Sequence, residues 1–408
     1  MDANVPFLSS ESWDEHMPER TRWLRQNDPV HWSEPDGVWL ISKFADVSAV
    51  SKDQDLFTSA HGVRPGSPAK IGLIDAGEPH HGQLRGLINR GFTPRTVRRL
   101  ETIFRGLVTE CIDRVAAQGE CDFVESIAVP LPLLVIAEMI GIRKEDRERF
   151  RRWSDAMITA DGRHDDPEIM AAAGAAFVEY SAYVTKIIED RRQNPQDDLV
   201  SVLVGAKDQG MLHQFDLERL PNEMSRDHLG LANDELIMLL VILLVAGNET
   251  TRNALSGGMQ LLIENPGERQ KLLDDPSLIR SAVEEMVRMV SPVHSFGRTV
   301  TRDTELRGKP LRQGQEVLVL YPSANRDEEV FEDADVFRVE RDPIHLGFGV
   351  GSHFCLGANL ARMEMRVAFE ELLRRLPDMK YAAGGPVVEP AALVRSCTEM
   401  RVRFTPER

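Results

Sequence analysis

Apolar residues recur at helical spacing through most of this chain, and only a few short stretches alternate in the way that strands do. Helical spacing dominates from Leu100 to Arg192, with interruptions at glycines and prolines. The stretch Leu236–Ala246 is apolar on every side, and the helical spacing continues as far as Leu262. The pattern therefore predicts a mainly α protein with one long, buried central helix.

Short apolar runs predict small β-sheet regions within this helical chain. The runs Val30–Trp32 and Val38–Ile41 flank the turn sequence Glu-Pro-Asp-Gly, which predicts a hairpin. Residues Val317–Leu320 are typical of a buried strand, and Met400–Phe404 alternates as a final strand would.

The composition indicates a soluble protein with a large core. The chain has 408 residues, 42 % of them hydrophobic, and a formal net charge of −16. Such an acidic chain is a poor nucleic-acid binder, and the run 236–246 is shorter than the ~20 residues of a membrane helix. The N-terminus lacks a basic stretch followed by an apolar run, so we expect no secretory signal, no membrane insertion and a cytoplasmic location. The cysteines, whose spacing predicts neither a zinc site nor a disulfide framework, are Cys111, Cys121, Cys355 and Cys397.

One cysteine stands apart because of its neighbours. Cys355 lies between a glycine-rich stretch and a run with helical spacing, where unpaired N–H groups and the helix dipole favour a thiolate. Nearby glycines, among them Gly349 and Gly357, would allow tight turns and the close approach of a large flat ligand. A buried structural thiol is the alternative, since most free cysteines are core residues. A thiolate held in this way suits the axial position of a haem iron.

The long apolar helix contains a second unusual stretch, Ala246–Thr251. A glycine within a buried helix costs roughly 0.5–1 kcal/mol. Either the helix ends at Gly247, or it continues with a local distortion in which small residues make room for a ligand. The helical spacing beyond this stretch favours the second interpretation.

Both stretches resemble motifs of the cytochrome P-450 family. The family's haem-binding loop, Phe-x-x-Gly-x-(Arg/His)-x-Cys-x-Gly, is matched by Phe348, Gly351, His353, Cys355 and Gly357. Residues 246–251 are similar to the family's Ala-Gly-x-(Asp/Glu)-Thr-Thr. The resemblance implies a single domain over residues 1–408 with the P-450 fold, β-rich near 28–75 and 290–325. It also implies haem b between the long central helix and the cysteine-loop helix.

The resemblance implies roles for individual residues. Cys355 would be the axial ligand of the haem iron, Thr250 would hydrogen-bond dioxygen, and Glu249 would help to relay protons. His81 and Arg85 match the family's His-x-x-x-Arg, although such a pair is usually a solvated helix face. The haem contacts implied by the resemblance are His81, Arg85, Ala246, Gly247, Arg298, Phe348, Gly349, His353 and Gly357. The substrate pocket is expected to be bordered by Val293, His294, Ser295, Phe296 and Val394.

A further motif concerns structure. Glu285 and Arg288 match the family's buried Glu-x-x-Arg pair, although a surface ion pair is the simpler interpretation of this spacing. The family often adds an arginine from a later Pro-x-Arg-Phe-like segment. Val336 occupies that position here, so Arg338 or Arg341 is expected to substitute.

Taken together, the motifs imply a bacterial haem-thiolate monooxygenase that inserts one atom of O2 into an apolar substrate. Electrons would come from a ferredoxin and an NAD(P)H-dependent ferredoxin reductase, and a monomer is expected. Residues 62–65, 153–155 and 198–203 are similar to actinobacterial sterol side-chain hydroxylases, which favours a steroid or other lipid-like substrate. A tailoring hydroxylase or epoxidase of a terpenoid or polyketide is the first alternative. A haem-thiolate protein that only binds a ligand, or isomerises one, is the second.

Two surface features complete the expectations. Residues Lys207–Leu231 form a polar stretch expected to be a surface insertion. A basic face for an acidic redox partner is hypothesised from Arg95, Arg98, Arg99, Arg362 and Arg366.

Overall fold

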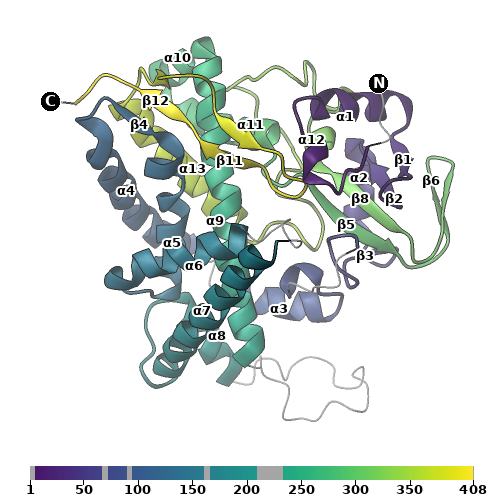
Figure 1. The fold of residues 1–408 in the computed structure, drawn as a ribbon, viewed down its shortest axis with the longest axis horizontal. Helices are drawn as coiled ribbons and strands as arrows, with labels where there is room; N and C mark the ends of the chain where they lie inside the picture. Colours follow the sequence, from purple (N-terminus) through teal and green to yellow (C-terminus); the bar gives the residue numbers. More distant parts are fainter. Residues whose placement is uncertain (1–4, 67–71, 90–93, 160–165, 209–232, 408) are drawn as a thin grey trace. The chain divides into compact units, whose positions relative to one another are not determined.

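A computed structural model describes residues 5–66, 72–89, 94–159, 166–208 and 233–407 (Figure 1). Apart from its first two residues, the predicted insertion Lys207–Leu231 lies outside these ranges. The chain divides into two compact units. The first comprises Met1–Lys70, Arg99–Pro132 and Glu249–Arg408, and the second comprises Ile71–Arg98 and Leu133–Asn248.

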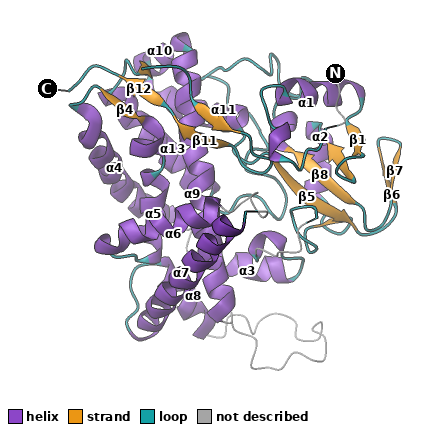
Figure 2. Ribbon diagram, viewed as in Figure 1, coloured by secondary structure: helices purple, strands orange, loops and turns teal. Residues whose placement is uncertain are grey.

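The largest sheet belongs to the first unit and has the strand order β1-β2-β8-β5-β3 (Figure 2). Strands β1 and β2 form the predicted antiparallel hairpin, and the predicted buried strand, β8, pairs in parallel with β2. Strand β5 joins β8 to β3 through antiparallel pairing on both sides. The bounds are β1 Val30–Ser33, β2 Val38–Ile41, β3 Phe57–Thr58, β5 Ser295–Val300 and β8 Glu316–Leu320.

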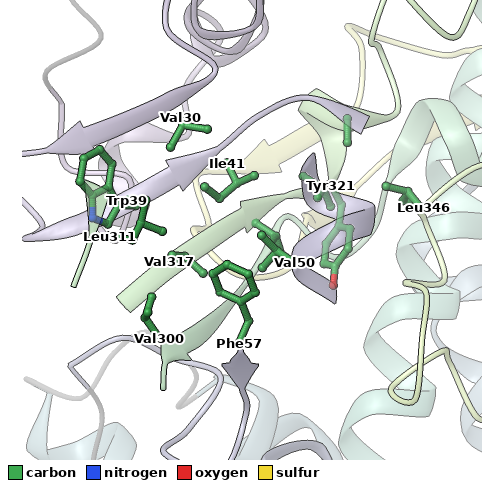
Figure 3. Packing of buried hydrophobic residues seen from close by; sticks show 13 residues of the cluster. Val30, Trp39, Ile41, Val50, Phe57, Val300, Leu311, Val317, Tyr321 and Leu346 are labelled. Atoms are coloured by element: carbon green, nitrogen blue, oxygen red, sulfur yellow. The ribbon is translucent and has the colours of Figure 1, made fainter. Parts of the chain in front are cut away.

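Both faces of this sheet are apolar. Neighbouring residues of a strand point to opposite faces, and here each face packs against its own buried cluster. In β2 and β8, Ile41 and Val317 pack into one buried cluster together with Phe57 and Tyr321 (Figure 3). Their neighbours, among them Leu40, Leu318 and Leu320, pack into a second cluster with Phe7 and Trp13 from the N-terminal segment. The sequences of β2 and β8 are therefore continuous apolar runs and do not alternate between apolar and polar residues.

Helices and small sheets make up the remainder of the first unit. The helices are α1 Met17–Asn27, α2 Phe44–Lys52, α4 Pro94–Ala116 from Arg99 onward, α10 Pro266–Asp274, α11 Ile279–Val290, α12 Tyr321–Ala324 and α13 Ala358–Arg375. The small sheets pair β4 Glu120–Asp122 with β12 Arg401–Arg403 and β9 Lys380–Tyr381, β10 Val387–Glu389 with β11 Ser396–Glu399, and β6 Thr304–Leu306 with β7 Lys309–Leu311. Strand β12 confirms the predicted final strand.

The second unit consists of helices and connecting loops, with no strand among its described residues. Trp153 of α6 packs against Tyr180 and Tyr183 of α7, and its Nε1–H donates to Glu179 at 3.0 Å. The buried Tyr180 hydroxyl donates to the carbonyl oxygen of Leu240 at 3.1 Å, which ties α7 to the first half of α9. The bounds are α3 His80–Ile88, α5 Pro130–Ile140, α6 Arg147–Thr159, α7 Pro167–Gln193 and α8 Leu199–Asp208.

The predicted long helix is α9, Asn233–Glu264. Every residue in this range is α-helical, so the helix continues through Gly247, as the favoured interpretation predicted. Gly247 also lets α9 pack closely on α5, because a Cβ at this position would lie 3.0 Å from Cδ1 of Ile136. By length and composition alone, Leu236–Glu264 could cross a membrane, a test that core helices of soluble proteins also pass.

Candidate active site: the cysteine loop and the central helix

The cysteine loop, residues 345–357, is folded by short-range backbone hydrogen bonds. The Cys355 N–H donates to Phe348 O at 2.8 Å, and helix α13 begins three residues later, with Gly357 as its N-cap. Gly349 and Gly351 have φ values of +68° and +81°, which side chains rarely tolerate. A Cβ on Gly351 would also lie 2.6 Å from the Ser51 carbonyl oxygen of α2. Glycine is therefore required where the loop turns and where it meets α2.

Cys355 differs from the other three cysteines in its surroundings. Cys355 is half-buried, whereas the other three are buried, and none of the four forms a disulfide. Burial raises the pKa of the Cys111 and Cys121 thiols to about 11 and raises that of Cys397 as well. These three thiols are therefore protonated near neutral pH, which leaves Cys355 as the candidate metal ligand.

Charged side chains from two helices hold the cysteine loop. Glu284 of α11 accepts hydrogen bonds from Arg362 of α13 at 2.7 and 2.8 Å and from Nε2 of His345 at 3.1 Å. Burial opposes the charge of Glu284, but these donors outweigh it and lower its pKa to about 2. The Arg362 guanidinium also lies 4.5 Å from the ring centroid of Phe348, a cation–π contact.

Sequence reasoning missed this network and assigned Arg362 to a basic surface. Arg366 likewise pairs with Glu101 and Glu370, at 2.8 Å in each case. Two of the five arginines of the hypothesised basic face are therefore neutralised by carboxylates. The adjacent pair Glu284–Glu285 on a strongly amphipathic helix was the available signal, since a buried acid beside a half-buried one calls for two sets of cationic partners.

The Glu285–Arg288 pair is buried, as the family motif implies. Arg288 donates to both oxygens of Glu285, at 2.7 and 2.8 Å, and both side chains are 0 % exposed. Two carbonyl oxygens, of Asn325 and Ala334, accept the remaining Nη1 donors of Arg288 at 2.7 and 2.8 Å. The third partner is Arg341, whose Nε lies 3.0 Å from Glu285 Oε1. Arg338, the other candidate, contributes only its backbone N–H, at 3.3 Å.

The predicted haem-contacting residues of the first unit gather beside the cysteine loop. Nε2 of His353 lies 2.9 Å from Ser59 Oγ. Arg298 on β5 is buried, and its Nη1 donates to the carbonyl oxygen of the neighbouring Gly297 at 2.7 Å. Burial raises the pKa of the Tyr321 hydroxyl, and the charge of Arg298 partly opposes this rise. That hydroxyl lies 3.9 Å from where a Cβ on Gly349 would be, so Arg298 and the loop share one neighbour.

The middle of α9 has one open face. Asn248, Glu249 and Thr251 are buried, whereas Ala246, Gly247 and Thr250, which share a helix face, remain partly exposed. Glu249 accepts a hydrogen bond from Asn253 at 2.7 Å and forms an ion pair with Arg252. The carboxylate is therefore held by side chains of its own helix.

The predicted substrate-bordering residues meet in the structure. Val293 and Val394 form an isolated β-bridge, and both are half-buried. Ser295 Oγ donates to Ala392 O at 3.3 Å. The Phe296 ring packs edge-on against the Tyr321 ring, with the ring centroids 6.1 Å apart. One face of the His294 ring is covered by the Trp13 ring, with the ring centroids 4.3 Å apart.

The remaining predicted contacts lie in the second unit. His81 is buried on α3, and its Nδ1 lies 2.9 Å from Glu78 Oε1. Arg85 lies one turn later on the same helix and is half-buried. The helical i, i+4 placement of this pair is therefore as predicted.

Comparison with known proteins identifies the family. The family model for cytochrome P450 matches residues 32–377. A steroid C26-monooxygenase of Mycobacterium tuberculosis is 40 % identical over 388 residues, which are 94 % of this chain and 93 % of that protein. The crystal structure of CYP109E1 from Bacillus megaterium in complex with testosterone has a TM-score of 0.81 at 31 % identity, covering 95 % of this chain and 98 % of that one. The cytochrome P450 PksS of the Bacillus subtilis bacillaene polyketide synthase has a TM-score of 0.83 at 30 % identity, covering 99 % and 100 %.

The chain belongs to the cytochrome P450 family, and the mainly α fold with small sheets is confirmed. It is a cytochrome P450 monooxygenase, and the family binds haem b through a cysteine thiolate. The described residues fit this cofactor. Between Gly347 and Gly357 no residue is fully buried, although this stretch includes Phe348 and Leu356, and a Cβ on Gly357 would meet no atom within 4 Å. The loop therefore offers a half-buried thiol beside partly exposed apolar groups.

Proposed function

We propose that the chain is a steroid monooxygenase that oxidises the side chain or ring system of a sterol-like molecule. The observation that carries this proposal is the 40 % identity to a steroid C26-monooxygenase over 94 % of the chain. A solved relative in complex with testosterone and the half-buried apolar pair Val293–Val394 support the same substrate class. An apolar substrate is held mainly by the removal of its surface from water.

The proposed roles of the site residues follow from their chemistry. Cys355 supplies the thiolate that holds the haem iron and donates electron density to it. Arg298, His353, His81 and Arg85 supply donors to the haem carboxylates, which would otherwise be poorly solvated. Phe348, Gly349, Gly357, Ala246 and Gly247 supply apolar or small surfaces against which a flat ring system can lie.

Thr250 and Glu249 are proposed to handle protons. The bound haem supplies the oxidising chemistry, whereas the protein delivers two protons and limits the access of bulk water. The Thr250 hydroxyl lies on the open face of α9 and can donate or accept a hydrogen bond there. Glu249 is buried one residue earlier, and a change in its pairing with Arg252 would let it pass a proton.

The electron donors are proposed to be a ferredoxin and an NAD(P)H-dependent ferredoxin reductase in the cytoplasm. The family requires an electron source besides O2 and a lipophilic substrate. Because Arg362 and Arg366 are paired with carboxylates, their contribution to an acidic partner's docking would be small.

A spectral titration of the ferric holoenzyme tests the substrate class. A ligand that displaces water from the iron changes the spin state and shifts the main absorption band. A saturating shift with a sterol enone, and none with a macrolide, is the result expected. The same titration tests the second candidate, a polyketide-tailoring oxygenase, which the similarity to PksS favours. A shift with a macrolide alone would replace the first proposal by the second.

A further inference from the structure

His294 lies where three distant segments of the first unit meet. Its Nδ1 is 2.8 Å from the carbonyl oxygen of Ala391, and its backbone N–H donates to Leu393 O at 2.7 Å. Because a carbonyl oxygen only accepts, Nδ1 carries the hydrogen. Burial lowers the pKa of His294 to about 4, aided by the charge of Arg395 and opposed by the bond to Ala391, so the ring is neutral at pH 7.

The N-terminal segment supports the other side of this ring. The Trp13 ring lies parallel to that of His294, with an interplanar angle of 5° and the ring centroids 4.3 Å apart. Trp13 is fixed in turn, because its Nε1–H donates to Phe7 O at 2.8 Å and its ring packs edge-on against Phe7. The backbone N–H groups of Phe7 and Leu8 donate to the Asp36 carboxylate in the β1–β2 turn, at 2.7 and 3.2 Å.

The segment 391–395 makes further contacts besides the two bonds to His294. The Arg395 N–H donates to Pro292 O at 2.8 Å, its Nη2 donates to Gln260 Oε1 at 2.8 Å, Ser295 Oγ donates to Ala392 O at 3.3 Å, and Val394 bridges to Val293. The two residues before this segment, Glu389 and Pro390, are exposed, and residues 391–395 are all half-buried. A contact that fixes Ala391 and Leu393 therefore sets the position of Val394, the residue after Leu393, within a small range.

We propose that Trp13 and His294 are positioning residues that determine substrate selectivity by fixing the segment 391–395. The proposal rests on the proposed function, in which Val293 and Val394 border the substrate. A long rigid ligand such as a sterol requires this border at one position, because it cannot bend to follow a displaced wall. A small ligand that binds the iron directly does not touch the border. The N-terminal segment, far from the cysteine loop in sequence, thereby selects among substrates.

The test compares three tryptophan variants of the holoenzyme. Trp13→Leu removes the stack, and Trp13→Phe keeps an aromatic ring. Trp23→Leu is the matched control, because Trp23 contacts a different histidine, His31, edge-on with the ring centroids 6.4 Å apart. Two measurements are made: hydrogen exchange of peptides covering 391–396, and spectral titration with a sterol enone and with imidazole. Trp13→Leu is expected to speed exchange in this segment and to weaken sterol binding about five- to tenfold, the usual range for one aromatic contact. Its imidazole affinity is expected to stay within about twofold.

Two histidine variants separate the stack from the hydrogen bond. His294→Asn retains a donor near the Nδ1 position but not the ring, and His294→Phe retains the ring but not the donor. Each is expected to give an intermediate effect on sterol affinity, and Trp13→Phe is expected to restore most of it. If Trp13→Leu fails to fold, these variants still show whether the contact between Trp13 and His294 fixes the segment 391–395.

Two results would overturn the inference. One is exchange of 391–396 in Trp13→Leu that matches the wild type. The other is sterol and imidazole affinities that fall together, as in a general loss of structure. Absence of any sterol shift in the wild type would instead refute the proposed substrate class, and exchange would still decide whether Trp13 fixes the segment.

Discussion

The cysteine loop and the segment 391–395 are both held by side chains from distant parts of the chain, but by different kinds of bond. Ionised groups hold the loop, since Glu284 binds Arg362 and His345, and these donors lower its pKa to about 2. Neutral groups hold the segment, through the His294 ring and a tryptophan stack. A hydrogen bond to a charged group contributes roughly 1.5–3 kcal/mol, whereas a neutral hydrogen bond contributes about 1 kcal/mol and can be exchanged singly. The loop is therefore fixed more firmly than the segment.

The largest effect is expected behind the loop, at the Glu285–Arg288 pair. Arg288→Met would leave Glu285 buried with Arg341 as its remaining cation, and we expect a loss of about 3–5 kcal/mol in the free energy of unfolding. Urea unfolding measures the loss. Arg338→Met is the control, because Arg338 pairs with Asp333 at the surface, where a pair is worth about 0–1 kcal/mol. Equal losses in the two variants would contradict the buried network.

A smaller effect is expected within the loop itself. Arg362→Gln removes the bidentate donor of Glu284 and the contact with Phe348, and we expect a loss of about 1–3 kcal/mol. The absorption band of the ferrous carbon monoxide complex, which reports thiolate ligation, is expected to lose part of its intensity. Arg366→Gln, one turn later on α13, pairs with Glu101 and Glu370 instead and serves as the control. An unchanged band in Arg362→Gln would show that the loop does not need this brace.

The two regions are expected to respond to acid in different ranges of pH. The pKa of His294 is lowered from 6.5 to about 4, so its contribution to stability is lost as the pH falls from about 6.5 to 4. The pKa of Glu284 is lowered from 4.5 to about 2, so its contribution is lost only below about pH 4.5. Hydrogen exchange at pH 5 is therefore expected to increase in 391–396 before it increases in 345–357. The His294→Phe variant should remove this difference, and simultaneous loosening in the wild type would contradict the assignment.

The smallest effect concerns Glu364 on α13. It is 3 % exposed, its Oε2 has no hydrogen-bond partner among the described atoms, and burial raises its pKa to about 8. Because the folded state retains this proton up to a higher pH than the unfolded state does, Glu364 lowers stability as the pH rises from about 4.5 to 8. Glu364→Gln is expected to stabilise the protein at pH 8 by roughly 1–3 kcal/mol and to be nearly neutral at pH 5. Thermal unfolding at the two pH values measures this, with Glu370→Gln, a half-buried and ion-paired glutamate on the same helix, as the control for loss of a charge.

Several features could be predicted from the sequence because they depend on neighbours along the chain. The β1–β2 hairpin follows from two apolar runs around a turn signal, and α9 follows from an unbroken apolar periodicity. The cysteine loop and the Glu285–Arg288 pair were predicted by motifs of fixed spacing, because tight turns and i, i+3 contacts are set locally. The helix continues through Gly247 as predicted, where the missing Cβ leaves room for Ile136 of α5, and the local distortion stays a prediction.

Contacts between distant segments could not be predicted in this way. The sequence by itself determined the fold class, the cysteine at the helix start and the family's paired residues, because periodicity and short spacings encode them. Only the tertiary structure decided that Arg341 rather than Arg338 completes the buried pair, that Arg362 braces the loop, and that Trp13 stacks on His294. Each of these partners is chosen by the packing of separate elements, and no local pattern records which of several arginines or aromatic residues reaches the site.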